Sequence, residues 1–460
     1  MPGYAQAGTS FDELDREQFM VNQSYYSEVA RALEEDQPKS ERLAARLLEN
    51  PELGFREQKT AAILVEALAP TGARIQTGLA LTGVMAELGP AGAPAIFLVA
   101  DMDALLTPSV PGGVAHSCGH HAQMTVIVAA FKALAAACVP EREGVRLVFL
   151  GVPAEEYLEM EFRLGLRSDG KVRFLSGKQE LLRLGYFSDA SVVLKYHSMP
   201  DQPGKVATVN GTLNGFIAKR ASFIGKSAHS GAWPEKGINA LNAASIAMLA
   251  IHAQRETFRD DDHIRVHPVM KSGGLTVNTV PDLAVLETYV RGASWAAIQD
   301  ASAKVDRALA AGAVAVGASV RIDNSPGYQP FRPDPALGEV LGRAARSVVD
   351  PALIDYHDQA YASDDIGDVA SLVPTCQLGF SGFTGTIHGP DFCPVDPVRA
   401  YHEPARILAA AAFELAMDGG ALAVSIQAGF KPVFGLEEYV ASLEALFASR
   451  TLSWDPARVG

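Results

Sequence analysis

The stretch that decides the fold is Ala95-Ile-Phe-Leu-Val-Ala-Asp-Met-Asp103, in which an apolar run leads directly into two carboxylates. A short, continuous apolar run of this kind is typical of a strand buried on both faces, as in a parallel sheet. The runs Val145–Gly151 and Ala190–Tyr196 share the pattern, and a fourth apolar segment surrounds Cys376–Phe380. The sequence therefore predicts an α/β fold built on a mostly parallel sheet.

Each of these predicted strands is followed by side chains of the kinds that bind divalent metals. In chain order they are Asp101 and Asp103, Glu155 and Glu156, His197, and His388. In open α/β sheets, sites form at the carboxyl ends of the strands, so we expect these side chains to meet in one cluster. Asp, Glu, His and Cys together favour one or two divalent metal ions.

Further candidate ligands lie between the first two strands, in His116-Ser-Cys-Gly-His-His-Ala-Gln-Met-Thr125. Cys118 and His120 flank one glycine, and side chains at this spacing diverge on a helix, so the pair is predicted to bind one ion from a loop. The Ala-rich segment 125–138 is predicted to be a helix whose N-terminus points at that loop. Such a helix end favours a thiolate.

Glu155 and Glu156 are adjacent carboxylates, which repel each other at a buried strand end unless a cation lies nearby. Neighbouring side chains on extended backbone point apart, so one glutamate can bind metal while the other faces a water molecule. A free glutamate beside a metal-activated water is a general-base arrangement for hydrolysis. Taken singly, such glutamates also fit N-caps or the surface, and His197 alone fits a core histidine.

The pattern changes from residue 212 to residue 325. Strand, helix, strand, strand, helix and strand are predicted at residues 215–224, 238–255, 263–271, 282–291, 294–311 and 314–323. This is the β-α-β-β-α-β order of a ferredoxin-like module. We therefore predict a catalytic domain formed by residues 1–211 and 326–460, into which residues 212–325 are inserted as a dimerisation or lid domain.

The inserted module carries three polar candidates for the site. His229 lies in a glycine-bounded loop, from which an imidazole can donate to a developing oxyanion. Asn278 and Arg291 are candidates for binding a substrate carboxylate, because the guanidinium fork matches a carboxylate. Without a metal cluster, all three would be interpreted as structural residues.

Helical segments are expected near the N-terminus at residues 11–36 and within residues 40–68, which a turn at residues 50–54 divides into two. The segment 158–180, which follows the glutamate pair, has two interpretations: a lid or substrate wall, or a solvated surface excursion. An amphipathic helix is expected at residues 436–449.

Composition narrows the classes of partner. The 460 residues carry a formal net charge of -14, with 48% hydrophobic and 20% charged residues. This is an ordinary globular composition, and the negative charge argues against nucleic acid and anionic membranes as partners. No apolar run is expected to approach the roughly 18 to 20 residues that cross a bilayer, and the N-terminus lacks signal-peptide features. Four cysteines without framework spacing favour a cytoplasmic location.

As a set, these stretches resemble the amidohydrolase branch of the aminoacylase and carboxypeptidase family of co-catalytic metallopeptidases. That branch contains hippurate hydrolases, auxin-conjugate hydrolases and aminobenzoyl-glutamate hydrolases. The motifs that carry the resemblance are residues 50–55, 100–105, 116–120 and 153–156, His197, the His229 loop, residues 278–281, Arg291 and residues 387–389. The resemblance implies a zinc-peptidase-like catalytic domain and a homodimer.

The resemblance also implies a site for two divalent metal ions, with Zn, Mn, Co and Ni as candidates. Its ligands would be Cys118, His120, Glu156, His197 and His388, with Glu155 as the general base. Asp103 would orient a ligand, and His229 would steady the tetrahedral intermediate, often in the site of the partner subunit.

Where the family usually continues Gly-His-Asp-x-His, this chain has His121 in place of the Asp and Gln123 in place of the second His. His121 is therefore an additional candidate for the site, and Asp101 at the end of the first predicted strand is another. The segment 158–180 also replaces the short Gly-rich turn usual after the glutamate pair.

The expected function is a metal-dependent amidohydrolase that cleaves the amide bond of an N-acyl amino acid or a related small conjugate. One alternative is a dipeptidase or carboxypeptidase, which would require a free α-amino group on its substrate. The alternative from another class is a catalytically silent metal-binding scaffold. A scaffold does not need Glu155, so the presence of that residue argues against it.

Overall fold

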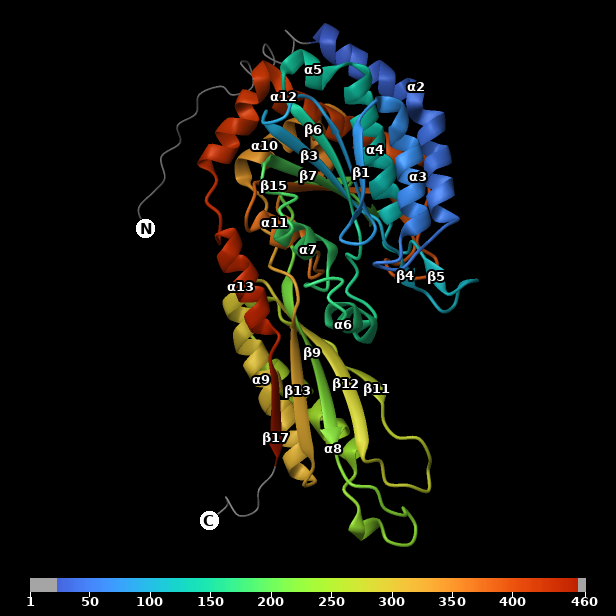
Figure 1. The fold of residues 1–460 in the computed structure, drawn as a ribbon, viewed down its shortest axis with the longest axis vertical. Helices are drawn as coiled ribbons and strands as arrows, with labels where there is room; N and C mark the ends of the chain where they lie inside the picture. Colours follow the sequence, from blue (N-terminus) through green and yellow to red (C-terminus); the bar gives the residue numbers. More distant parts are fainter. Residues whose placement is uncertain (1–22, 454–460) are drawn as a thin grey trace.

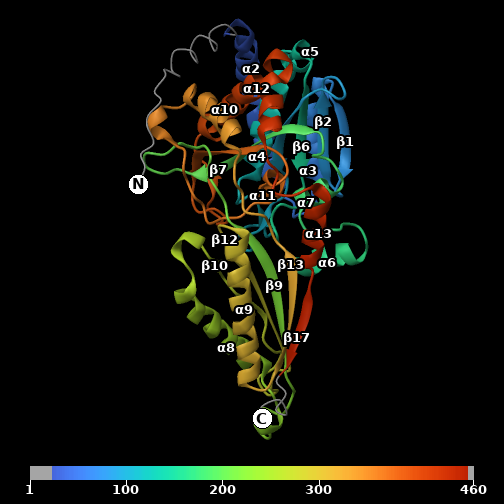
Figure 2. The ribbon, with the colours of Figure 1, turned by 90° about the vertical axis from the view of Figure 1, so that its left-hand side faces the viewer.

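The computed structural model describes residues 23–453, which form two lobes stacked along the long axis of the molecule (Figure 1). The larger lobe holds a mostly parallel sheet between helices, and the smaller lobe holds an antiparallel sheet with helices on one face (Figure 2). The predicted fold class is therefore confirmed. Residues 11–22 of the first predicted helix lie outside the described residues.

The large sheet has its four predicted strands side by side. Its order is β1 (Arg74–Leu79), β2 (Gly83–Leu88), β6 (Arg146–Val152), β3 (Ala95–Asp101), β7 (Ala190–Pro200), β15 (Thr375–Thr384), β8 (Ala207–Thr208) and β14 (Ile354–Asp355), and β16 (Cys393–Pro394) pairs with β15. Strand β3 runs parallel to both β6 and β7, and β7 runs parallel to β15. Their carboxyl ends therefore lie at one edge, above the smaller lobe.

The alternation along β3 shows why this strand is apolar throughout. Ile96 and Leu98 belong to a core with the helices of one face, whereas Phe97 and Val99 belong to a second core on the other face. The helices of the first face are α2 (Gln23–Leu48), α3 (Gln58–Leu68), α4 (His120–Ala136), α5 (Val139–Glu143), α10 (Pro335–Arg346) and α12 (Glu403–Gly429). Those of the second are α7 (Gly177–Arg183), α11 (Ile366–Ala370) and α13 (Leu436–Leu446).

Helix α12 contradicts the expectation that no apolar segment of the chain is long enough to cross a bilayer. Together with the preceding π-helical turn η6 (Val398–His402), it is long and apolar enough to cross a membrane, although no such segment was expected. Most of its apolar stretch is buried inside the protein, and its backbone leaves helical geometry from Met417 to Gly420. Both features are those of a core helix that packs on a sheet.

The smaller lobe has the predicted ferredoxin-like order. Its elements are β9 (Gly215–Ile224), α8 (Ala240–Ala253), β10 (Arg265–Val266), β11 (Val269–Ser272), β12 (Leu283–Gly292), α9 (Trp295–Ala315) and β13 (Ser319–Pro326). The strand expected at residues 263–271 is divided into β10 and β11, both of which pair with β12. The sheet order is β10, β12, β9, β13 and β17.

Strand β17 (Ser449–Ser453) joins the sheet of the smaller lobe from the C-terminal end of the chain, where it pairs with β13 (Figure 1). The expected helix at residues 436–449 ends earlier, as α13, and the chain then extends into this strand. The domain boundaries at residues 212 and 325 stay a prediction. Strand β17 lies in the stretch assigned to the catalytic domain, residues 326–460, but pairs with a strand of the inserted module.

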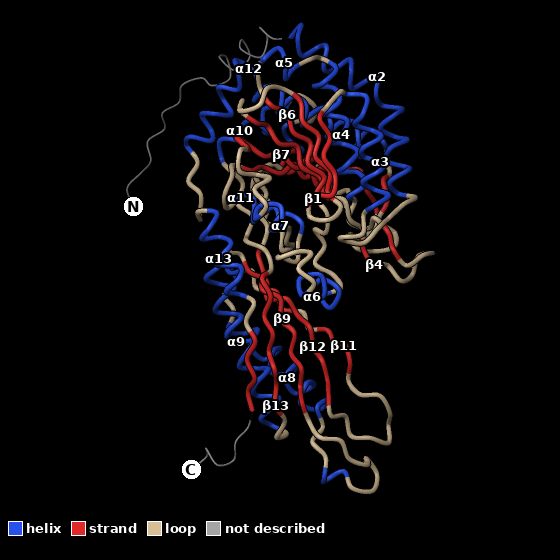
Figure 3. The backbone as a smooth tube through the Cα atoms, viewed as in Figure 1, coloured by secondary structure: helices blue, strands red, loops and turns tan. Residues whose placement is uncertain are grey.

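Short elements complete the described chain: β4 (Leu105–Leu106), β5 (Val114–Ala115), α6 (Met160–Ser168), and the 3-10 turns η1 (Ala69–Thr71), η2 (Pro234–Lys236), η3 (Gln254–Thr257), η4 (Asp260–Asp262) and η5 (Pro351–Leu353). Loops fill the region between the large sheet and the smaller lobe (Figure 3). The candidate site lies in that region.

We predict that Gly312→Ala destabilises the smaller lobe. A Cβ atom at this position of α9 would lie 2.6 Å from the backbone nitrogen of Ala247 on α8 and would also meet the carbonyl oxygen of Ala243. Overpacking of this kind costs about 1–3 kcal/mol, so the midpoint of thermal unfolding should fall. Gly165→Ala is the control, because the glycine of α6 has open space around it. An unchanged midpoint for Gly312→Ala would contradict this account of the packing of α8 on α9.

Candidate active site

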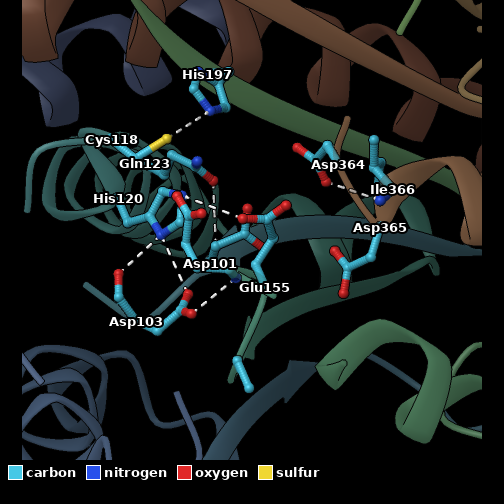
Figure 4. A network of polar contacts seen from close by, with 12 residues as sticks. Asp101, Asp103, Cys118, His120, Gln123, Glu155, His197, Asp364, Asp365 and Ile366 are labelled. Carbon is cyan, nitrogen blue, oxygen red and sulfur yellow. Dashed lines mark hydrogen bonds and ion pairs between the residues drawn. The ribbon is translucent and has the colours of Figure 1, made fainter. Parts of the chain in front are cut away.

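The candidate metal ligands converge at the carboxyl ends of β3, β6, β7 and β15. Figure 4 shows Cys118, His120 and His197 beside Glu155. Asp101 ends β3 and Asp103 follows it, Glu155 follows β6, and His197 lies near the end of β7. Cys118 and His120 enter from the start of α4, and His388 comes from the loop after β15. The predicted clustering at one sheet edge is confirmed.

The five predicted ligands form two groups that share one residue. The ligand atoms of Cys118, His120 and His197 all lie within 4.8 Å of one another. Those of Cys118, Glu156 and His388 also lie within 4.8 Å of one another. Two overlapping triads of thiol, imidazole and carboxylate suit two adjacent divalent ions, with Cys118 between them.

The orientation of His120 fits a metal ligand. Its Nδ1 lies 2.8 Å from the carbonyl oxygen of Asp103 and 3.3 Å from the Asp103 carboxylate. Its Nε2 is buried without a hydrogen-bond partner among the described residues. An imidazole that donates one N–H to a carbonyl or carboxylate leaves the other nitrogen free for a metal. Asp103 is thus placed to orient a ligand, as the resemblance implies.

His197 and Cys118 show a related arrangement. The Nδ1 of His197 lies 2.8 Å from the carbonyl oxygen of Ser198, and its Nε2 lies 3.6 Å from the Cys118 Sγ. The hydroxyl of Ser198 donates to the carbonyl oxygen of Cys118 at 3.1 Å. These contacts with Ser198 hold both candidate ligands, and the His197 Nε2 and Cys118 Sγ atoms face each other.

Unusual backbone conformations position several of these residues. His120 opens α4 instead of lying in a loop, and Gly119 before it has a left-handed φ of 80°. A Cβ atom at Gly119 would collide with the Ser198 side chain. Ala154 and His388 also have positive φ, of 54° and 68°. Such conformations are costly for residues with a Cβ atom and are often found at functional sites.

The two adjacent glutamates differ in environment. Burial and the nearby Asp364 carboxylate raise the pKa of Glu155 well above its usual value. Burial acts in the same direction on Glu156, but the His388 imidazole, whose Nε2 lies 3.3 Å from its carboxylate, lowers the pKa of Glu156 to about 2. Glu156 is therefore ionised and ready to bind a cation. Divalent ions at the site would oppose the shift of Glu155 and favour its basic form.

Two lysines and three aspartates form a buried charge network beside the triads. The ammonium of Lys195 lies 2.6 Å from the Asp101 carboxylate and also contacts Asp364. The ammonium of Lys178 contacts Asp101 and Asp365. Although burial alone would lower it, these carboxylates hold the pKa of Lys178 well above its usual value. Such a network is stable only while both signs of charge are present.

The network was not foreseen from the sequence, although the sequence contains two signals for it. Lys195 interrupts the apolar run of β7, where a buried ammonium requires a buried carboxylate. Asp364 and Asp365 form a second adjacent acidic pair, which resembles the glutamate pair in its need for a cation. Their partner Lys178 comes from a segment whose role the sequence left open.

That segment, residues 158–180, is neither a lid alone nor a surface excursion. Leu158 lines the site cavity, which agrees with the predicted substrate wall. Arg163 of α6 is buried and donates to the carbonyl oxygens of Ala154 and Glu156. The segment also contains Lys178, whose ammonium group belongs to the buried charge network beside the site.

The additional candidates Asp101 and His121 are placed differently from the five ligands. Asp101 lies near His120 and Glu155, but its carboxylate is already bound by two ammonium groups. His121 turns away, and its Nε2 lies 3.4 Å from the Tyr401 hydroxyl. Burial lowers the pKa of His121 to about 3, so it is a neutral core histidine. Gln123 accepts from the Asp101 backbone N–H at 3.2 Å.

Four of the candidate ligands, Cys118, Glu156, His197 and His388, line a cavity of about 470 Å³. Arg291 lines it, together with a wall of aromatic side chains. The aromatic residues are Tyr157, Phe216, Tyr289 and Tyr328. This combination suits a small ligand with an apolar part and one anionic group.

The remaining two candidates lie outside this cavity. His229 and Asn278 are exposed on adjacent loops of the smaller lobe, where the Ser230 N–H donates to the Asn278 carbonyl oxygen at 3.0 Å. Neither residue lines the cavity of its own chain. The structure therefore brings His229 and Asn278 together, but not with the metal-ligand candidates.

Comparison with known proteins identifies a family and several similar proteins. The model of a family described as peptidase family M20/M25/M40 matches residues 97–414. The Xaa-Arg dipeptidase of Mus musculus is 30% identical over 211 residues, which are 45% of this chain and 43% of that protein. An IAA-amino acid hydrolase of Arabidopsis thaliana, ILR1-like 4, is 26% identical over 317 residues, 66% of this chain and 67% of that protein.

The fold also matches solved structures. The Bacillus subtilis YXEP protein, described as a dinuclear metal binding peptidase from the M20 family, superimposes with a TM-score of 0.61 at 21% identity. The match covers 83% of this chain and 99% of that one. The likeness therefore extends over most of this chain and concerns the fold alone.

We predict that Lys178→Met destabilises the protein markedly. The replacement leaves the carboxylates of Asp101 and Asp365 buried without their shared ammonium, and loss of one member of a buried pair costs about 3–5 kcal/mol. Thermal or urea unfolding measures the effect. Lys171→Met is the control, because this lysine of the same segment pairs with Asp169 at the exposed surface. Equal stability of the two variants would contradict the role given to Lys178.

Proposed function

The chain belongs to peptidase family M20/M25/M40, and on that premise we propose that it is a two-metal amidohydrolase acting on an N-acyl amino acid or a related small conjugate. The observation that carries the proposal is the pair of ligand triads that share Cys118. Beside them stands Glu155, a buried carboxylate that belongs to neither triad. A scaffold that only bound metal would not need this second carboxylate.

The donor set fits the proposed ions. Cys118, His120 and His197 offer a thiolate and two imidazoles, and Glu156 and His388 add a carboxylate and a third imidazole. Zn, Mn, Co and Ni are the candidate metals, because borderline divalent ions accept this mixture of ligands. When bound, two such ions lower the pKa of a water molecule and polarise the amide carbonyl.

The residues of the chain have separate tasks in this proposal. Glu155 takes a proton from the attacking water and returns it to the leaving amine. Arg291 binds the carboxylate of the substrate, and the aromatic wall with Tyr289 holds the apolar acyl group. Asp103 keeps His120 oriented through its carbonyl and carboxylate oxygens.

Two named relatives support amide cleavage but differ in substrate. One hydrolyses IAA-amino acid conjugates by its name, and the other is a dipeptidase. The matched stretch covers 43% of the dipeptidase, so its activity transfers to this chain only as an alternative. A dipeptidase would require a free α-amino group, whereas the proposed amidohydrolase accepts a blocked one.

We further propose a homodimer in the cytoplasm. His229 and Asn278 are exposed together on the smaller lobe, and Leu275 and Val277 of the same loop region are fully exposed. Apolar side chains in this position favour contact with a second copy of the chain. In such a dimer, His229 would reach the cavity of the partner and stabilise the oxyanion. The free cysteines of the described chain suit a reducing compartment.

We predict that Glu155→Gln abolishes turnover while metal binding is retained. Loss of a general base lowers kcat by about 10²–10⁴-fold. The assay is amine release from a panel of N-acyl amino acids and dipeptides, with Mn, Zn, Co or Ni supplied. Glu159→Gln is the matched control on the same loop, because Glu159 pairs with Arg56 and does not line the cavity. Equal activity of the two variants would remove Glu155 from the base role.

We predict that two inactive variants complement each other when mixed. Glu155→Gln removes the base, and His229→Ala removes the imidazole that each chain lends to its partner. In a randomly mixed homodimer, about a quarter of the sites receive both intact groups. Activity should therefore reappear after the variants are mixed and allowed to exchange subunits. Should His229 act within its own chain, or not at all, mixing would restore nothing.

A further inference from the structure

A second cavity, of about 1020 Å³, lies on the open face of the smaller sheet. Arg291 and Tyr289 line both this cavity and the cavity at the candidate metal ligands, so the two cavities adjoin at these residues. We propose that Arg265 and Arg291 form a paired anion site at this junction, where a dicarboxylic substrate is held by both of its carboxylates. This proposal rests on the proposed function and adds a substrate class to it.

The two guanidinium groups start from directly opposed backbone positions. Arg265 of β10 and Arg291 of β12 are cross-strand partners in an antiparallel pair. Partners of this kind project from the same face of a sheet, and like charges in directly opposite positions destabilise the pairing. Both side chains line the same cavity. An anion held between them would remove this repulsion.

The other cations around the cavity have acidic partners. Arg220 lies 2.6 Å from Glu161, Lys219 lies 2.9 Å from Asp306, and Arg321 lies 3.0 Å from Asp323. Lys271 lies 4.0 Å from the Glu287 carboxylate. These charges are balanced within the protein and leave little attraction for a ligand.

Arg265 and Arg291 form no ion pair within residues 23–453. Arg265 donates to the carbonyl oxygen of Ile264 at 2.9 Å, and Arg291 donates to the hydroxyl of Ser363 at 3.2 Å. Each guanidinium therefore keeps most of its donors free. In a chain with a formal net charge of -14, two adjacent cations without carboxylate partners point to an anionic ligand.

Aromatic rings hold both guanidinium groups in place. Arg265 lies over the ring of Tyr361, with 4.1 Å between the guanidinium carbon and the ring centroid. Arg291 lies 5.5 Å from the ring centroid of Tyr289 and 5.7 Å from that of Phe216. Stacking restricts the side chains before a ligand arrives, which lowers the entropy cost of binding.

The two cavities hold different parts of the proposed substrate. Arg291 reaches the metal-site cavity, so it binds the carboxylate nearer the scissile amide. Arg265 lines only the outer cavity, so it binds a carboxylate farther along the molecule. The second carboxylate can belong to the amino-acid side chain or to the acyl chain. The shared chemistry is a substrate with two carboxylates, and the geometry makes Arg265 a specificity-determining residue.

The test compares matched substrates with the metal-loaded enzyme. N-benzoyl-glutamate is compared with N-benzoyl-glutamine, and N-succinyl-phenylalanine with N-butanoyl-phenylalanine, so that each pair differs in one distal carboxylate. The wild type should favour the dianion of at least one pair in kcat/KM. Arg265→Gln should reduce kcat/KM for that dianion by about 10- to 100-fold and leave its neutral match unchanged, as expected for a charge-assisted hydrogen bond. The pair that responds identifies which half of the substrate carries the second carboxylate.

Arg321→Gln is the matched control, because Arg321 lines the same outer cavity but is paired with Asp323. It should leave both ratios unchanged, and Arg265→Lys should restore part of the preference. An equal loss for dianionic and neutral substrates in Arg265→Gln would assign Arg265 a structural role and overturn the proposal.

Absence of turnover with every substrate would contradict the proposed function but would still leave the anion site open to a direct test. In that case, calorimetry measures the affinity of glutarate and of butanoate for the wild type and for Arg265→Gln, and this comparison tests the anion site. Glutarate should bind the wild type more tightly than butanoate and lose this advantage in the variant. Equal binding of the two acids by the wild type would overturn the paired site.

Discussion

Carboxylates that lie buried at the ends of parallel strands need positive charge within a few ångströms, and most of this structure can be understood from that constraint. Adjacent buried acids repel each other, and their desolvation favours the neutral form. The chain meets this need twice at one sheet edge. Asp101, Asp364 and Asp365 contact the ammonium groups of two lysines, whereas Glu156 lies among thiol and imidazole groups that suit metal ions.

The two solutions have different consequences. Ammonium groups supplied by the chain are always present. The network of Lys178 and Lys195 therefore stabilises the folded structure next to the site. Metal ions are exchangeable and can activate water. The triads that share Cys118 therefore serve the proposed catalysis. Glu155 stands between the two, near Asp364 on one side and His120 on the other. Its protonation therefore depends on both networks.

The sequence predicted the features that follow from periodicity and from local chemistry. Apolar runs that end in acids or histidines identified β3, β6 and β7, and the order of elements identified the ferredoxin-like module. The sequence also predicted that the acidic and histidine side chains after these strands lie at one edge of the sheet, because the carboxyl ends of parallel strands meet there. These inferences need only the pattern of a segment and the geometry of a strand.

Features that depend on distant partners were not predicted. Nothing local shows that Lys178 meets Asp365, since the two are far apart in the sequence and join through tertiary packing. His121 was an open candidate because it stands where the family usually has an Asp, yet the start of α4 at His120 turns it toward Tyr401. The position of β17 in the smaller sheet is a long-range pairing of the same kind.

The most direct measurement of the central claim is the number of metal ions bound per chain, by elemental analysis of purified wild type, Glu155→Gln and Glu156→Gln. The account predicts two ions in the wild type and in Glu155→Gln, and fewer in Glu156→Gln, because only Glu156 belongs to a ligand triad with Cys118 and His388. A wild type that binds no more than one ion, or an equal loss of metal in both variants, would contradict it.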